Sequence, residues 1–433
     1  MTDHVIVVDL GYGDAGKGGI VDWLCSQPAA LGAGGRPFHA VVRFNGGAQA
    51  AHHVISPGGR AHAFAQFGSG TFSAGVRTYL SRFMLVDPLA MTAEAAHLTE
   101  LGVPGPYELV TVDRDALLTT PYHQAANRAR EAARGAGRHG SCGMGIGETA
   151  SYALLHGADA PRAGDCAAPR TLNRKLSLLR DRLAADAGFP RRATPPPAAV
   201  AAAYRAWAGR VTLADEEHLV RLLRAGPVVF EGAQGVLLDE WRGFHPYTTW
   251  STTTFANART LLARSGESAL RLGVIRCYMT RHGPGPFVTE DPTLDLPEPH
   301  NRGGRWQGPF RTGHLDAVAL RYATQVCGGA DAVALTHLDS ARRRAGELRV
   351  CRAYLAGGQR VTRIAPGPDR DLAYQERLTG MLLAARPVYD EADRPAARDW
   401  PEAVAEIVGA PVLVRSDGPG AAAKTACLTG VSR

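Results

Sequence analysis

The chain has 433 residues, of which 45% are hydrophobic and 21% charged, a balance typical of globular proteins that bury a sizeable core. Its formal net charge of +7 favours anionic partners, but no basic run with interleaved aromatic residues occurs. Phosphate-rich small molecules are therefore favoured over nucleic acid as partners.

The seven cysteines are scattered, odd in number and without a C-x-x-C pair, which argues against a disulfide framework and against a zinc site. The sequence shows no leader of charged and then apolar residues at its N-terminus, and no run of about 18 apolar residues. We therefore expect a cytoplasmic protein without a membrane partner.

Six apolar, β-branched runs, each ending at glycines or polar residues, are predicted to be strands of one large, mostly parallel sheet. Helical stretches separate these runs, so we expect an α/β fold with helices on both faces of the sheet. Ligands of such sheets bind at the carboxyl ends of the strands. The runs lie at residues 4–10, 39–44, 227–235, 272–285, 331–339 and 410–420.

Two segments interrupt this alternation. Residues 115–225 are predicted to be a largely helical insertion, with the clearest helices at 121–137 and 170–188. Residues 284–312 are rich in proline, glycine and charge without any periodicity, and a long loop of this kind is commonly functional. We expect one domain over residues 1–433, with this insertion and long active-site loops.

The first strand is followed by the sequence GYGDAGKGG, in which Gly11, Gly16 and Lys17 match the phosphate-loop spacing G-x-x-x-x-G-K. Backbone N–H groups and a lysine in such a loop bind phosphate. Gly18 stands where a phosphate loop has the Ser or Thr that binds magnesium. Asp14 lies inside the loop, where a carboxylate repels phosphate unless it binds Mg²⁺ or acts as a base. The alternative is that Asp14 only caps the next helix.

Polar side chains at other strand ends also suit a nucleotide. His52 and His53 follow the second strand after a small-residue turn, and an imidazole there suits an acid or donor to a γ-phosphate, although histidine pairs also occur in cores and on surfaces. Asp339 follows the fifth strand and is able to accept the N1–H and N2–H of guanine. The RSDGPG sequence at 415–420 suits a cover for the base.

Together these motifs resemble those of the adenylosuccinate synthetase family, the GTP-dependent ligases that join aspartate to IMP. The resemblance runs from VVDLGYGDAGKGGIVDWL to VLVRSDGPG and includes FEGAQGVLLDEWRGFHPYTTWSTTT, YMTRHGPGPFVTE and RTGHLDAVALR in the family's order. It implies a P-loop-like α/β fold, GTP as a co-substrate, Mg²⁺ as a cofactor, a purine nucleotide and an amino acid as substrates, and a homodimer.

The resemblance also implies roles for individual residues. Asp14 matches the base that takes the N1 proton of IMP and binds Mg²⁺, His52 matches the acid that stabilises the transferred phosphate, and the carbonyl of Ala51 matches a second magnesium ligand. In the family, O6 attacks the γ-phosphate to give a 6-phosphoryl intermediate, from which the amine of aspartate displaces phosphate. The other matched positions are Gly13, Gly16, Lys17, Gly18, His53, His337, Asp339, Ser416 and Gly418 for GTP, and Gln49, Ser141, Cys142, Gln234, Thr249, Arg305 and Arg311 for the substrates.

The chain departs from the family's pattern at several of these places. Ala15 and Gly19 replace an acid and a second lysine of the phosphate loop, His337 replaces a lysine, and Cys142 replaces a threonine that contacts the IMP phosphate. The segment 300–312 has three arginines where the family has a dense run. IMP and aspartate are therefore the default substrates, with the same activation of another lactam nucleotide, or another amine, as the alternative. A nucleotide-binding protein without ligase activity is a third hypothesis.

Overall fold

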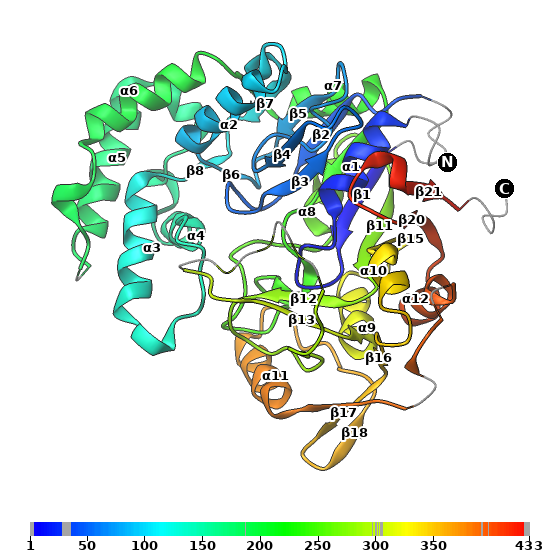
Figure 1. Cartoon of the computed structure of the whole chain (residues 1–433). Coiled ribbons are helices and arrows are strands. Elements are labelled where there is room, and N and C mark those ends of the chain that lie inside the picture. The colour runs from blue at the N-terminus through cyan, green and yellow to red at the C-terminus, as the bar shows by residue number, and fades with distance from the viewer. Residues whose placement is uncertain are drawn as a thin grey trace.

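A ten-stranded sheet forms the centre of the structure, a computed structural model that describes residues 4–27, 36–186, 188–296, 298, 301, 303, 306–390, 393–396 and 398–427 (Figure 1). Every pairing in this sheet is parallel except that of β20 with β21. The strands lie in the order β21 (Lys424–Ala426), β20 (Val412–Ser416), β15 (Ala332–Thr336), β11 (Ala269–Arg276), β1 (His4–Asp9), β10 (Val228–Glu231), β2 (Ala40–Arg43), β5 (Arg77–Leu80), β7 (Val110–Asp113) and β9 (Thr212–Ala214).

The six predicted strands are the six neighbours from β20 to β2 in this order, so the expected α/β fold with a mostly parallel sheet is confirmed. One boundary was wrong. The predicted strand at 272–285 divides, because β11 ends at Arg276 and β12 (Met279–His282) pairs antiparallel with β13 (Phe310–Gly313) in a separate ribbon. An apolar run does not reveal a turn inside it.

The register brings charged residues together at one edge of the sheet. Glu231 pairs with Val7 on one side and with Arg43 on the other, Asp9 pairs with Val274, and Arg276 pairs with Thr336. Because these strands are parallel, their carboxyl ends meet at the same edge. The loops that follow this edge carry most of the predicted site residues.

Alternate residues of β1 face opposite layers of helices. Val5 and Val7 pack in one core with α1 (Lys17–Ser26), whereas Ile6 and Val8 pack in the opposite core. This alternation is what the pleat of a strand imposes. The second core is formed with α7 (Glu216–Ala225), α8 (Ala256–Ala263), α9 (Ala317–Val326) and α12 (Trp400–Val408), so helices cover both faces.

A third core lies beside the β5–β7 end of the sheet and is built mainly by helices of the 88–208 region. These are α2 (Pro88–Glu100), α3 (Pro121–Ala133), α4 (Ile146–His156), α5 (Pro169–Leu183) and α6 (Pro197–Ala208). The predicted helices at 121–137 and 170–188 are present and end a few residues early. Since β9 returns to the main sheet from within 115–225, the division into a domain and an insertion stays a prediction.

The remaining elements are short strands outside the main sheet and two further helices. The strands β3 (His52–Ile55) and β4 (Ala61–Phe64) form a hairpin beside α1. The others are β6 (Leu85–Val86), β8 (Leu117–Leu118), β14 (Leu315–Asp316), β16 (Val350–Cys351), β17 (Ala353–Ala356), β18 (Gln359–Val361), β19 (Arg386–Val388), α10 (Leu338–Arg343) and α11 (Leu372–Ala384).

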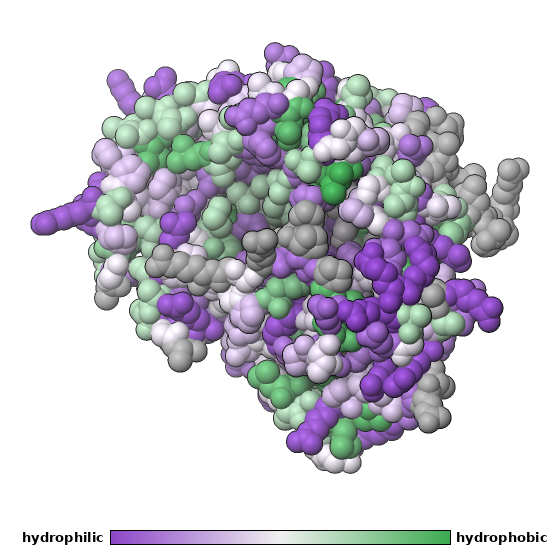
Figure 2. Space-filling view, viewed as in Figure 1, coloured by the Kyte–Doolittle hydropathy of each residue, from purple (hydrophilic) through white to green (hydrophobic). Residues whose placement is uncertain are grey.

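The surface fits the bulk composition. In Figure 2 the strongly hydrophobic residues appear as small separate groups, and hydrophilic residues gather over the region of α10 and α12. All seven cysteines are free thiols, as expected. Within the described ranges, no helix combines the length and the apolar character needed to cross a bilayer.

Candidate active site

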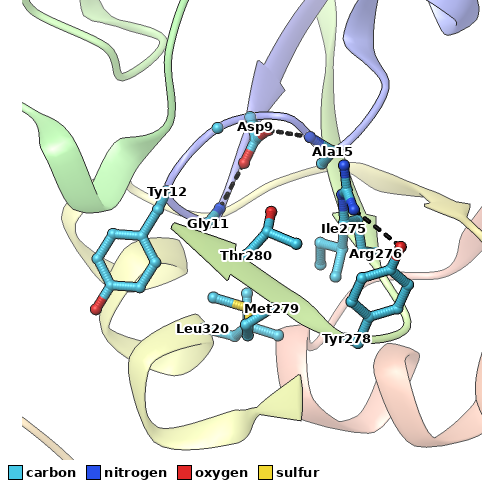
Figure 3. Close-up of a pocket in the computed structure, with 11 residues that line it drawn as sticks. Asp9, Gly11, Tyr12, Ala15, Ile275, Arg276, Tyr278, Met279, Thr280 and Leu320 are labelled. Carbon is cyan, nitrogen blue, oxygen red and sulfur yellow. Dashed lines mark hydrogen bonds between the residues drawn. The ribbon is translucent and has the colours of Figure 1, made fainter. Parts of the chain in front are cut away.

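The loop between β1 and α1 is organised by Asp9, the last residue of β1. Its carboxylate accepts hydrogen bonds from the backbone N–H groups of Gly11 (2.8 Å) and Ala15 (2.9 Å), which Figure 3 shows as two dashed lines. The ammonium of Lys17 lies 3.3 Å from the same carboxylate and donates to the carbonyl oxygen of Gln234 at 2.7 Å. The lysine of the phosphate-loop motif is therefore buried and paired with a carboxylate.

The pocket beneath this loop is too small for a substrate. It is lined by residues from the loop and from the 275–280 segment, and its volume of about 10 Å³ is room for roughly one water molecule (Figure 3). This pocket is therefore not the nucleotide site.

Asp14 is held by its backbone and leaves its carboxylate available. Its φ of 59° is in the left-handed region, and its carbonyl oxygen accepts a hydrogen bond from Nε of Arg276 at 2.6 Å. The carboxylate is about one-third exposed (32%), and one oxygen lies 3.7 Å from Nε2 of His282. The N-cap of α1 is Gly16, with no side-chain cap, so Asp14 does not serve as a helix cap.

His52, at the start of β3, is oriented by a buried carboxylate. Its Nδ1 lies 2.6 Å from Oε1 of Glu231, which also accepts hydrogen bonds from the backbone N–H and the hydroxyl of Ser69. Among the described residues, Nε2 of His52 is buried and has no hydrogen-bond partner. The imidazole therefore presents one unsatisfied nitrogen, which suits a ligand.

The electrostatics of this pair follow from burial and from a nearby cation. Burial alone raises the pKa of Glu231, but the charge of Arg43, the charge that His52 carries when it is protonated at low pH, and the hydrogen bonds from His52 and Ser69 outweigh it and hold that pKa at about 2. Burial lowers the pKa of His52, and the attraction of Glu231 opposes this without reversing it. In the ligand-free protein His52 is therefore a neutral imidazole whose Nδ1–H donates to an ionised glutamate.

His52 packs directly against the first turn of α1. A Cβ built on Gly18 would lie 2.5 Å from the Cβ of His52 and 3.0 Å from Oγ of Ser69. Contacts this short between carbon atoms do not occur in real structures, so the position accepts only glycine. The predicted acid and the predicted phosphate loop thus belong to one site.

Two glutamine amides converge on the turn at Gly46 and Gly47. Gln234 has a left-handed backbone (φ 56°), and both polar atoms of its side chain are buried without a hydrogen-bond partner among the described residues. Oε1 of Gln49 is in the same state. Because buried amides are normally satisfied, this group is built for a polar ligand. Gln49 and Gln234 were both predicted to contact the substrate.

The predicted phosphate end of the acceptor site lies around the loop that precedes α4. Ser141 Oγ accepts a hydrogen bond from Asn127 at 2.8 Å. Burial raises the pKa of Cys142 to about 11, so its thiol is neutral at physiological pH. Thr249 is fixed through its backbone N–H, which donates to Leu238 at 2.8 Å. The roles of these residues in substrate binding stay predictions.

The residues predicted to bind the guanine base, His337 and Asp339, follow β15, and His337 lies beside Gly16 of the phosphate loop. His337 has a left-handed backbone (φ 59°), and its Nδ1 lies 2.9 Å from the hydroxyl of Thr336. A Cβ on Gly16 would lie 3.9 Å from its ring. Burial, followed by the charges of Arg276 and other cations, holds the pKa of His337 well below its usual value, so the ring is neutral. The carboxylate of Asp339 accepts from Arg343 at 2.7 Å and is 24% exposed.

The long loop at 284–312, which carries the predicted substrate residues Arg305 and Arg311, contacts the residue that holds the phosphate loop through a charged group. Glu298 pairs with Arg276, the residue that holds the carbonyl of Asp14, and accepts from the hydroxyl of Tyr278 at 2.5 Å. Arg311 donates to Glu290 at 2.7 Å and to the carbonyl of Gly285 at 2.9 Å. The predicted residue Arg305 lies outside the described residues.

The remaining predictions concern the metal and the second loop. Ala51 is exposed immediately before β3, and His53 points to the other face of that strand from His52. A partly exposed carboxylate and a loop carbonyl are oxygen ligands of the kind that Mg²⁺ takes together with phosphates and water. Asp14 and Ala51 therefore fit the ion, and their role as its ligands stays a prediction.

Sequence reasoning missed four ionisable residues of the candidate site: Asp9, Glu231, Arg276 and His282. Three of them are the last residues of β1, β10 and β11, and a charged residue that ends a buried strand was the signal that could have found them. His282, at the end of β12, followed a strand end that was not recognised as separate.

Comparison with known proteins agrees with this geometry. The family model of adenylosuccinate synthetase matches residues 6–424. The adenylosuccinate synthetase of Desulfovibrio desulfuricans is 33% identical over 406 residues, covering 90% of this chain and 88% of that protein. The enzyme of Neisseria gonorrhoeae is 31% identical, covering 97% of each chain.

Two solved structures share the fold. The fully ligated adenylosuccinate synthetase of Plasmodium falciparum superimposes with a TM-score of 0.76 at 19% identity, covering 98% of this chain and 99% of that one. The succinoaminodeoxyadenylate synthetase of cyanophage S-2L, bound to dGMP and dATP, gives a TM-score of 0.61 at 18% identity, covering 98% and 95%.

Proposed function

Because this chain belongs to the adenylosuccinate synthetase family, we propose that its site joins IMP to aspartate at the expense of GTP and releases adenylosuccinate, GDP and phosphate. The observation that carries the proposal is the meeting of three groups at one sheet edge. These are a phosphate loop with the partly exposed carboxylate of Asp14, a glutamate-held imidazole, and the side-chain amides of Gln234 and Gln49; among the described residues, Nε2 of that imidazole, both polar atoms of Gln234 and Oε1 of Gln49 have no hydrogen-bond partner.

In the proposed reaction Asp14 accepts the N1 proton of IMP, and the electrons of the ring move to O6. O6 then attacks the γ-phosphorus of GTP, GDP leaves, and a 6-phosphoryl nucleotide forms. Two observations support this role for Asp14: its carboxylate is partly exposed, with His282 3.7 Å away, and Arg276 fixes its backbone carbonyl. When bound, Mg²⁺ neutralises charge on the phosphates.

His52, which packs against Gly18 in the first turn of α1, contributes to the same step. Glu231 fixes the tautomer in which Nδ1 carries a proton, so that Nε2 faces the incoming phosphate. Phosphate charge raises the proton affinity of Nε2, and the resulting imidazolium stabilises the transition state. In the second step the amine of aspartate attacks C6 and phosphate leaves, with Gln234 and Gln49 holding the nucleotide.

The proposal is tested by following oxygen atoms. With IMP labelled with ¹⁸O at position 6, attack by O6 requires the label to appear in released phosphate, with product formation that depends on both GTP and aspartate. Phosphate without label, or turnover that requires a different amine or purine, contradicts the proposal. Asp14→Asn should abolish turnover and leave GTP binding within a few-fold, and retained turnover removes Asp14 from the role of base.

We also propose that the protein acts as a homodimer in the cytoplasm, on the resemblance to its family. Light scattering at micromolar concentration is expected to give twice the chain mass. A monomer mass together with full activity contradicts the dimer.

A further inference from the structure

Lysine is almost absent from this chain. Among its 48 Lys and Arg residues only Lys17, Lys175 and Lys424 are lysines, and all three are buried, with exposures of 3%, 8% and 8%. Lysine and arginine are rarely buried unless they are paired. Because almost every cationic side chain of this protein is an arginine, the three buried lysines indicate places that accept a compact ammonium and not a planar guanidinium.

Two of the three lysines are neutralised by carboxylates. Lys17 lies 3.3 Å from Asp9, and Lys175 lies 2.8 Å from Asp165. Lys424 differs, because its ammonium donates to three uncharged carbonyl oxygens, those of Gly420 (2.9 Å), Pro419 (3.0 Å) and Gly418 (3.5 Å). Neutral acceptors satisfy its hydrogen bonds, and no carboxylate of the described residues lies within ion-pair distance, although the charge of Asp22 on α1 acts on it from farther away.

The place of Lys424 in the fold is next to the phosphate loop. It lies on β21 directly opposite Ser416 of β20, and Figure 1 shows β21 at the edge of the sheet next to α1. A Cβ built on Gly19 would lie 3.2 Å from Nζ and 3.3 Å from Cε of Lys424. The ammonium thus occupies the space that a side chain of Gly19, in the first turn of α1, would need.

The phosphate loop needs a cation from elsewhere. Its own residues include two carboxylates, Asp9 and Asp14, and a single ammonium, that of Lys17. Arg276 binds the carbonyl oxygen of Asp14, but its guanidinium is paired with Glu298, so the loop proposed to receive a triphosphate gains little net positive charge from it. Charges at this short range act strongly in a partly buried site. A second ammonium beside the first turn of α1 corrects this imbalance.

We propose that Lys424 is a positioning residue of the nucleotide site, which supplies from the last strand the second positive charge that the phosphate loop lacks and holds the 416–420 loop over the start of α1. This inference rests on the proposed binding of GTP. It goes beyond that proposal by assigning a residue from β21 to the phosphate site.

The main test is the dissociation constant of GTP with Mg²⁺, measured by calorimetry without an acceptor so that no turnover occurs. Lys424→Gln keeps an N–H donor for the carbonyls and removes the charge, and we expect it to weaken GTP binding at least tenfold and to reduce the dependence of binding on ionic strength. The matched control is Lys175→Gln, which should lower the melting temperature and leave the dissociation constant within twofold.

A charge exchange separates the electrostatic role from a structural one. Gly19→Lys alone should weaken binding, since its side chain collides with Lys424. In combination with Lys424→Gln it should recover most of the lost affinity, because the ammonium returns to the same turn. Unchanged affinity in Lys424→Gln, an equal loss in Lys175→Gln, or no recovery in the double variant overturns the inference.

One measurement needs no variant. Burial lowers the pKa of Lys424 to about 8, against the attraction of Asp22 on α1, and Asp22 stays ionised and His337 neutral above pH 7. GTP affinity should therefore fall as the pH rises from 7 to 8.5, below the range in which the N1–H of guanine itself ionises, and a flat profile contradicts the inference. If the binding results are as expected but no adenylosuccinate forms, the proposed reaction is contradicted and the role of Lys424 is not.

Discussion

Gly18 and His52 are in direct contact, so the position at which a phosphate loop carries its Ser or Thr has no room for a side chain here. The missing magnesium ligand is thus the consequence of placing an imidazole against the first turn of the helix. His52, at the start of β3, fills the space that a side chain at position 18 would need. The polar groups of the candidate site are therefore divided between the loop after β1 and the segment that leads into β3.

This contact predicts the effect of restoring the motif. Gly18→Ser should push His52 away from its place and lower kcat about 100-fold, since a displacement of about 1 Å in a catalytic group has an effect of that order. Gly380→Ser is the matched control, because nothing lies within 4 Å of a Cβ at that helical position. The kcat of both variants is measured by steady-state kinetics. A Gly18→Ser enzyme as active as the parent would show that the contact between Gly18 and His52 does not matter for catalysis.

Glu231 should make stability depend on pH in a defined window. Its pKa is about 2 in the folded protein and 4.5 in the unfolded chain, so the folded state binds fewer protons. The stabilisation is fully present above pH 4.5 and is lost as the pH falls toward 2, with a total of about 3 kcal/mol. Urea unfolding should show that the free energy of unfolding depends less steeply on pH between 2.5 and 5 in Glu231→Gln than in the parent protein. The same dependence on pH in both proteins would argue against the ion pair.

Replacing Gln234 should impair substrate binding without lowering the stability of the protein. Its amide makes no hydrogen bond within the described structure, so Gln234→Ala should leave the melting temperature unchanged or raise it, while the KM for IMP rises about tenfold for one lost hydrogen bond. The control is Gln66→Ala, whose buried amide bonds both backbone groups of Asp87 at 2.8 and 2.9 Å. That change should destabilise the protein and leave KM unchanged. A large loss of stability in Gln234→Ala would contradict the finding that the side-chain amide of Gln234 has no hydrogen-bond partner in the described structure.

His337 should weaken the preference for guanine. Its ring is neutral and bonded to Thr336, so the carboxylate of Asp339 has Arg343 as its charged neighbour. We expect kcat/KM values for GTP and ATP within about tenfold, and Asp339→Asn should lower the value for GTP alone. A strong preference for GTP in the parent enzyme would show that His337 replaces the lysine without loss.

The sequence was enough to predict the fold class and the region of the site. Six apolar runs that end at glycines or polar residues predicted six strands, which are the neighbours from β20 to β2, because buried parallel strands need such runs. The same runs placed Asp14, His52, Gln234 and His337 at one edge of a sheet. These are properties of local chain composition, and tertiary contacts did not change them.

Only the tertiary structure decided how the charges of the site are paired. Lys17 is paired with Asp9, His52 with Glu231, and the backbone of Asp14 is held from Arg276, each across a distance in sequence that no local pattern encodes. The two glycines that depart from known motifs, Gly18 and Gly19, are explained by side chains that arrive from β3 and β21. Local sequence sets which residues stand at the strand ends, and the order of strands in the sheet sets which of them meet.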